Sequence, residues 1–168
     1  MQLLVHTLTT TALCMVAPTI VLIVAIGLGK EAFRQDYPAD IQQAMPPATP
    51  REKRAGLVWG SLFMVVLLGA MTLSTWLYLT EHPGVFNAYF AALGAGIMFL
   101  IYDLLIVDWL VICTWRPAWV MPRGTAECAG WGDYMFHAKV LCQAKVIAAN
   151  LALPLLPAAL AFGLHAWM

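Results

Sequence analysis

Residues 87–113 read NAYFAALGAGIMFLIYDLLIVDWLVIC, and this stretch decides the fold. It is long and apolar enough to cross the roughly 30 Å hydrocarbon core of a bilayer as one helix. It nevertheless contains two carboxylates, Asp103 and Asp108. An ionised carboxylate is costly in hydrocarbon, so each must be protonated, paired with a cation or hydrated by a cavity. We therefore expect the rest of the chain to form walls around this helix.

The composition excludes a water-soluble globular domain. The chain is 62% hydrophobic and 11% charged, whereas soluble domains average about 45–50% apolar and about 25% charged residues. Four apolar segments approach or exceed the length of a membrane span, and the predicted helices cover residues 3–28, 50–79, 88–113 and 146–167. The predicted fold class is all-α. We expect one polytopic integral membrane domain, residues 1–168, with four transmembrane helices in two antiparallel hairpins.

The basic residues predict the orientation of the chain. All nine fall in or beside the two long loops, as Lys30, Arg34, Arg51, Lys53, Arg54, Arg116, Arg123, Lys139 and Lys145. The positive-inside rule then makes both long loops cytoplasmic and both termini external in an inner (plasma) membrane. No Lys or Arg precedes the first apolar run, which is about twice as long as a signal-peptide core. We expect that run to be retained as a helix.

The two long loops carry signals for the membrane surface. Thr49-Pro50-Arg51-Glu52 predicts a capping box that starts the second helix, and the adjacent basic residues favour anionic lipid as a partner. In the first loop, apolar residues recur every four positions from Phe33 to Met45. The second loop contains Trp115, Trp119 and Trp131. Both patterns predict short interfacial helices that rest at the level of the lipid headgroups.

The positions of Asp103 and Asp108 follow from helical geometry. Counting back from Asp103 by threes and fours gives a stripe of small residues closed by Phe99, a face suited to packing on another helix. Asp108 lies five residues on, which is about 140° around an α-helix. We therefore predict a buried Asp103 and an interfacial Asp108. The alternative for Asp103 is a protonated side chain that donates a hydrogen bond to a neighbouring helix.

The fourth predicted helix supplies a partner for these acids. Pro154 frees the backbone carbonyl of Asn150, so both polar groups of that residue are available near the inner third of the membrane. Asp103, Asp108 and Asn150 together form a hypothetical ion or proton site. A plain proline kink without a ligand is the alternative.

A second polar group lies in the second long loop. Glu127, Asp133 and His137 fall on the same side of the membrane as Asp108. Acid–base chemistry at the inner headgroup layer would need Asp133 and His137 to converge on Asp108. The sequence contains no recognised catalytic set, so we assign no catalytic residue.

Metal ligation finds weak support. His6, His82 and His165 would lie outside the membrane but come from separate elements. Three cysteines, Cys113, Cys128 and Cys142, could form a zinc set with His137, but no CxxC spacing nucleates one. We predict no metal and no cofactor.

The segment from residue 101 to 137 is similar to small bacterial membrane proteins. The similarity covers less than a quarter of the chain and implies no particular activity. It is carried by Tyr102-Asp103, Asp108-Trp109, Pro122, Gly124-Thr125, Glu127, Asp133-Tyr134 and His137.

Three functions are compatible with these patterns. The first is a non-enzymatic module that forms a homo-oligomer or serves as an accessory subunit of a larger membrane complex, because four short-looped helices barely enclose a substrate path. The second is a proton- or cation-coupled transport unit that uses Asp103. The third is a membrane enzyme with acid–base residues at the cytoplasmic face. The composition offers no basic surface for a nucleic-acid partner.

Overall fold

The structure is a computed structural model that describes residues 1–167, and every regular element in that range is a helix. The elements are α1 (Gln2–His6), the π-helix η1 (Thr7–Thr11), α2 (Ala12–Cys14), α3 (Val16–Gly29), the 3-10 turn η2 (Arg34–Asp36), α4 (Ala39–Ala44), α5 (Pro50–Leu79), α6 (Val85–Tyr102), the π-helix η3 (Asp103–Trp115), the 3-10 turn η4 (Ala129–Gly132), α7 (Tyr134–Leu141), α8 (Ala144–Ala152) and α9 (Leu155–Trp167).

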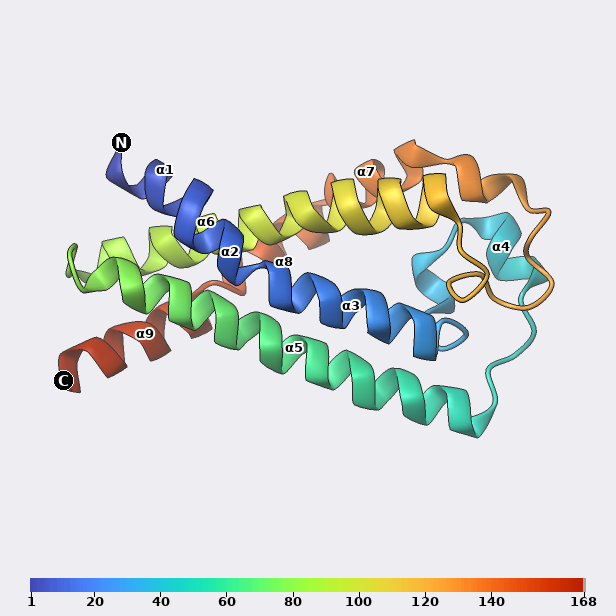
Figure 1. Ribbon diagram of the computed structural model, residues 1–168, viewed down its shortest axis with the longest axis horizontal. Coiled ribbons are helices and arrows are strands. Elements are labelled where there is room, and N and C mark those ends of the chain that lie inside the picture. The colour runs from blue at the N-terminus through green and yellow to red at the C-terminus, as the bar shows by residue number, and fades with distance from the viewer. Residues whose placement is uncertain (168) are drawn as a thin grey trace.

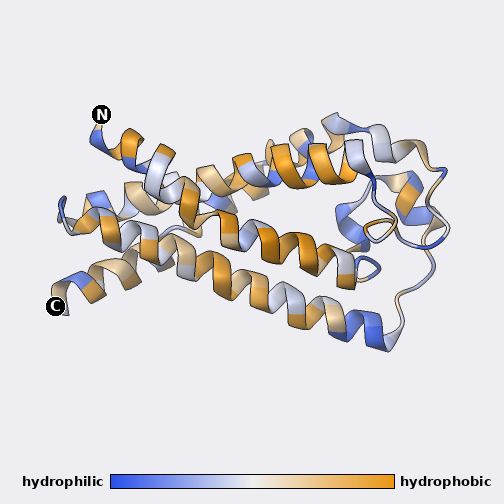
Figure 2. Ribbon diagram, viewed as in Figure 1, coloured by the Kyte–Doolittle hydropathy of each residue, from blue (hydrophilic) through white to orange (hydrophobic). Residues whose placement is uncertain are grey.

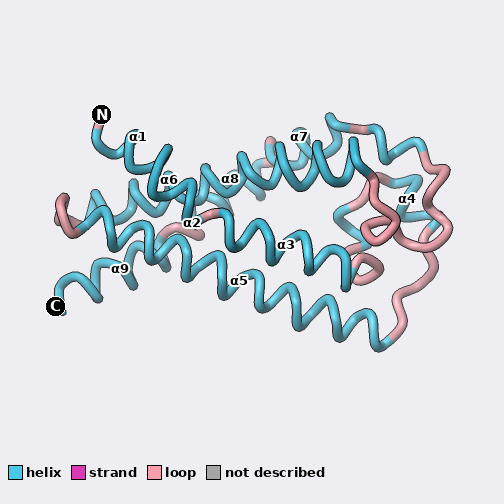
Figure 3. The backbone as a smooth tube through the Cα atoms, viewed as in Figure 1, coloured by secondary structure: helices cyan, strands magenta, loops and turns pink. Residues whose placement is uncertain are grey.

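The helices form an elongated bundle with two different ends (Figure 1). One end, which we call the turn end, holds both termini and the short connection between α5 and α6. The other, the loop end, gathers the two long connections with α4 and the surrounding loops (Figure 3). The bundle therefore has the alternation of short and long connections predicted from the sequence.

Within residues 1–167, three helices are long and apolar enough to cross a membrane: Pro50–Leu79, Val85–Trp115 and Ala144–Trp167. Gln2–Cys14 and Val16–Gly29 make a fourth candidate span if the pair is counted as one helix bent by 43°. The bend follows from Pro18, which has no N–H to donate to the carbonyl of Cys14. Apolar residues predominate along the helices, and the hydrophilic residues concentrate at the loop end (Figure 2).

The second predicted helix matches α5 closely. Thr49 accepts a hydrogen bond from the backbone of Glu52, whose side chain accepts one in return from Thr49 N at 2.7 Å, and Pro50 is the first helical residue. The predicted capping box is therefore confirmed.

Small residues let the helices approach closely. Ala92, Ala95 and Phe99 of α6 are buried, which confirms the predicted packing stripe. Between α3 and α5 the contact is closer still, because a Cβ added to Gly29 would meet Gly56 Cα at 2.8 Å. These two glycines allow the backbones of α3 and α5 to touch near the loop end.

The two loops differ from the predicted interfacial segments. Tyr37, Ile41 and Met45 are buried with Trp131 against η3, in one apolar cluster. The ring of Trp131 is 1% exposed and donates a hydrogen bond to Thr125 O at 2.6 Å. For these four side chains the expected place among lipid headgroups is wrong, because the loops fold back on the protein and bury them there. Short helices do lie in both loops, and Trp115 and Trp119 are exposed.

The fourth span is broken where its prolines predicted a kink. Helix α8 ends at Ala152 and α9 begins at Leu155. Pro154 is fully buried at this break. As a result α9 packs on α5 and α6, whereas α8 packs on α6 and α7.

Candidate functional site

The helix that contains both acids changes its hydrogen-bond pattern at Asp103. Up to Tyr102 it is an α-helix, and from Asp103 to Trp115 it is a π-helix, in which hydrogen bonds link residues five apart. The pattern continues past its end, where Arg116 N donates to Val111 O at 2.9 Å. Residues i and i+5 therefore lie one turn apart, and Asp103 and Asp108 share one side of η3.

This register corrects the predicted positions of the acids. The angle of about 140° between them applied to an α-helix, and it is wrong for a π-helix. Both side chains are partly buried and both line the same cavity. Asp108 therefore lines the same cavity as Asp103.

The cavity has a volume of about 380 Å³ and lies among α3, the segment before α4, α5, the α6–η3 helix and α7. Its polar members are three carboxylates, one imidazole, an amide and a phenol. It is lined by Leu22, Ala25, Ile26, Phe33, Gln35, Asp36, Tyr37, Gly60, Phe63, Phe99, Asp103, Asp108, Ile112, Phe136, His137, Val140 and Leu141. Since Gln35 and Asp36 are exposed, the cavity reaches the surface at the loop end.

His137 joins α7 to η3 through Asp108. His137 Nδ1 lies 3.1 Å from Asp108 Oδ1, and the two side chains are 8% and 17% exposed. A second contact supports the same junction, since Trp109 Nε1 donates to Tyr134 O at 3.1 Å. One proton shared by the pair can sit on the imidazole, which makes the contact an ion pair, or on the carboxyl, which makes it a neutral hydrogen bond.

No protein family matches this chain, and neither do curated proteins or solved structures. The chemistry of the site must therefore be inferred from its own residues.

Asp36 brings a third carboxylate to the mouth of the cavity. The pKa of Asp36 is raised above its usual range, first because surrounding protein atoms remove part of its hydration and second because of the negative charge of Asp108. His137 opposes this shift. The charges of Asp108 and His137 therefore act on Asp36, although Asp36 lies in the first long loop and His137 in the second. No periodic pattern in the sequence places Asp36 here.

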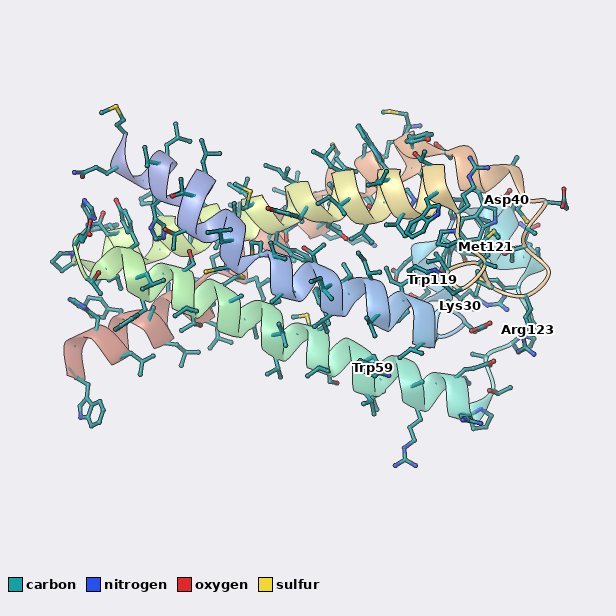
Figure 4. The ribbon with its side chains drawn as sticks, viewed as in Figure 1. Lys30, Asp40, Trp59, Trp119, Met121 and Arg123 are labelled. Carbon is teal, nitrogen blue, oxygen red and sulfur yellow. The ribbon has the colours of Figure 1, made fainter. Side chains whose placement is uncertain are left out.

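Cationic side chains hold the loop end together around the cavity. Lys30 Nζ donates to Trp119 O at 3.0 Å and to Ala118 O at 3.3 Å (Figure 4). Arg123 Nη2 pairs with Glu52 Oε1 at 3.0 Å, and Arg123 Nε lies 3.9 Å from the buried Glu31. These contacts fasten the second loop to the ends of α3 and α5.

The other predicted site residues lie elsewhere. Asn150 is on α8 and is absent from the cavity lining found within residues 1–167. Asp133 is exposed and caps α7 by accepting a hydrogen bond from Phe136 N at 3.0 Å. Glu127 is exposed on the second loop. Of the predicted polar cluster, the structure therefore brings only His137 to Asp108.

Two of the three predicted external histidines approach each other at the turn end. His6 and His82 both contact the ring of Tyr78, with ring centroids 5.1 Å and 4.6 Å away. His6 Nε2 also donates to Ser74 O at 3.0 Å. A second cavity, of about 510 Å³, is lined by His6, Tyr78 and His82 among others.

Across residues 1–167, no three His, Cys, Asp or Glu side chains are arranged to hold a metal ion. The cysteines Cys113, Cys128 and Cys142 are free thiols.

Proposed function

We propose that this chain is a proton- or cation-coupled membrane transport unit whose coupling site is the cavity around Asp103, Asp108 and His137. The observation that carries the proposal is the π-helical register, which places two carboxylates one turn apart in a cavity that also contains a histidine. Acids and histidines within membrane spans are the usual groups of proton relays and cation sites.

The proposal includes membrane insertion with the loop end in the cytoplasm. All nine Lys and Arg residues lie in or next to the two long connections, as the positive-inside rule requires. The outward faces of the spans expose large apolar side chains that suit lipid, including Leu62, Val65, Leu73, Ile97 and Leu105. Anionic lipid would then face the basic residues at the start of α5.

The cavity residues suggest an order for proton entry. Asp36 is exposed at the mouth and would exchange protons with the cytoplasm. The Asp108–His137 pair lies next and can hold one proton in either of two positions. Asp103 lies one π-turn deeper. A proton or another monovalent cation would therefore reach Asp103 last.

An apolar layer separates this cavity from the turn end. Along α5, Phe63 lines the inner cavity, Met71 is fully buried in an apolar cluster, and Tyr78 lines the cavity at the turn end. The cluster also contains Met15 and Met98. Methionine side chains repack easily, so this layer could close one cavity while the other is open, as alternating access requires.

The turn-end side of the layer is polar. The hydroxyls of Thr11 and Ser74 lie 2.7 Å apart, and His6 contacts Ser74. These groups could continue a proton path to the second cavity once the methionine layer opens.

A flux assay tests the proposal. Purified protein in liposomes should carry protons down an imposed gradient, measured with a pH-sensitive dye inside the vesicles. Asp103→Asn should lower the flux about tenfold or more, because it removes the deepest ionisable group. Glu127→Gln, an exposed acid outside the cavity, is the matched control and should retain the flux. Equal flux in wild type and Asp103→Asn would contradict the proposal.

The remaining hypotheses predict other outcomes. If wild type shows no flux and purifies only with another polypeptide, the non-enzymatic module that the sequence ranked first is favoured. The Asp108–His137 contact is one of the two that the enzyme hypothesis requires. The hypothesis lacks the required convergence, because Asp133 serves as a helix cap.

A further inference from the structure

The cavity walls are more apolar and aromatic than a binding site for an inorganic ion requires. Four phenylalanines line it, and each comes from a different part of the chain: Phe33 after α3, Phe63 on α5, Phe99 on α6 and Phe136 on α7. Leucine, isoleucine, valine and alanine side chains fill much of the remaining wall. A hydrated Na⁺ or K⁺ would gain little from such a surface.

The charge of the cavity is complementary to a cation. Its lining contains three carboxylates and one histidine, and no Lys or Arg is among the lining residues found within residues 1–167. The carboxylates do not form a metal-binding group with the other described side chains. His137 is 8% exposed and uses Nδ1 to contact Asp108, which leaves its other ring nitrogen for a ligand or water.

The size of the cavity limits the ligand. A volume of about 380 Å³ falls near the lower end of the roughly 300–1,000 Å³ found for small-molecule pockets. It can hold an amine with one aromatic ring or a short alkyl body, and it is too small for a whole phospholipid. Aromatic rings also attract ammonium groups through the negative potential of their faces.

We propose that the cavity binds an organic ammonium ion with an apolar body, the ammonium held by Asp103 and Asp108 and the body by the four phenylalanines. This inference rests on the proposed function and names its substrate class.

Equilibrium binding tests the inference with the full-length protein in lipid nanodiscs. The probe is radiolabelled benzyltrimethylammonium, and empty nanodiscs measure partition into lipid. Its uncharged carbon isostere, neopentylbenzene, is the matched competitor, and NaCl is the inorganic one. Wild type should bind the probe saturably, and neither competitor should displace it at equal concentration.

Variants separate the charged and aromatic contributions. Asp103→Asn and Asp108→Asn should each weaken binding about tenfold or more, and Phe63→Leu should weaken it several-fold by removing one ring. Asp103→Glu, which keeps the negative charge, should recover part of the affinity. Such recovery would show that the weaker binding of Asp103→Asn comes from the lost charge and not from misfolding. Glu127→Gln should bind as wild type does.

The outcomes distinguish this inference from the proposed function. Saturable binding that depends on Asp103 and Phe63 supports the inference even if no ion flux is measured, in which case the transport proposal fails alone. Flux without saturable probe binding overturns the inference and leaves the transport proposal standing. Equal binding by wild type and Asp103→Asn, or displacement by neopentylbenzene as effective as by unlabelled probe, also overturns it.

Discussion

His137 Nδ1 lies 3.1 Å from Asp108 Oδ1, and this contact joins the short helix α7 to the π-helix η3. It makes the second long loop part of the cavity wall, since α7 also contributes Phe136 and Val140.

Breaking the contact should destabilise the protein. His137→Ala should lower the free energy of unfolding by about 1–3 kcal/mol, because it leaves a partly buried carboxylate without its partner. The double variant with Asp108→Asn should lose less than the sum of the two single variants. Chemical denaturation in detergent measures all three. Additive losses would show that the two side chains do not interact.

The close approach of α3 and α5 predicts a contrast between two glycines. A Cβ at Gly56 would meet Ala32 Cβ at 2.5 Å, whereas nothing lies within 4 Å of a Cβ at Gly69. Gly56→Ala should therefore cost about 1–3 kcal/mol through overpacking. Gly69→Ala should be neutral or stabilise by up to about 1 kcal/mol, because alanine favours the helix. Equal melting temperatures for the two variants would contradict the described packing.

Asp36 predicts a dependence of stability on pH. Its pKa is raised in the folded protein, so the folded state holds this proton at pH values where the unfolded chain, with a pKa of about 3.9, has lost it. Stability should therefore rise as the pH falls through the folded pKa, and the ionised Asp36 should be destabilising at pH 7. The cause is lost hydration, added to the charge of Asp108.

Asp36→Asn removes this titration. At pH 7 the variant should melt at a higher temperature than wild type, and the difference should shrink as the buffer is made more acidic. Melting curves from intrinsic tryptophan fluorescence, measured from pH 7 down toward the unfolded-state pKa of about 3.9, check this. A variant that melts lower than wild type at pH 7 would show that the carboxylate of Asp36 is stabilising when ionised.

Several features could be predicted from the sequence because they depend on local patterns. The limits of α5 followed from the Thr49–Glu52 capping box and from the apolar run behind it. The break at Pro154 followed from a missing backbone donor.

Other features depend on contacts that local patterns do not encode. The π-register from Asp103 onward was missed because apolar residues without a polar face fit either helical period. Asp36 was missed because its place at the cavity depends on how the first long loop folds back. Trp131 was assigned to the membrane surface, but the packing of Tyr37 and Ile41 around it buries it.

The most direct test of the central claim is a cysteine-accessibility scan of η3. In a background without the four native cysteines, single cysteines at positions 103, 107 and 108 are treated with a small cationic thiol reagent in sealed vesicles. The cavity lining predicts that positions 103 and 108 react, while position 107, occupied by the 1% exposed Val107, does not. An α-helix would turn position 108 about 140° away from position 103 and out of the cavity. Reaction at 103 and 107 but not at 108 would contradict the shared cavity, and with it the proposed site.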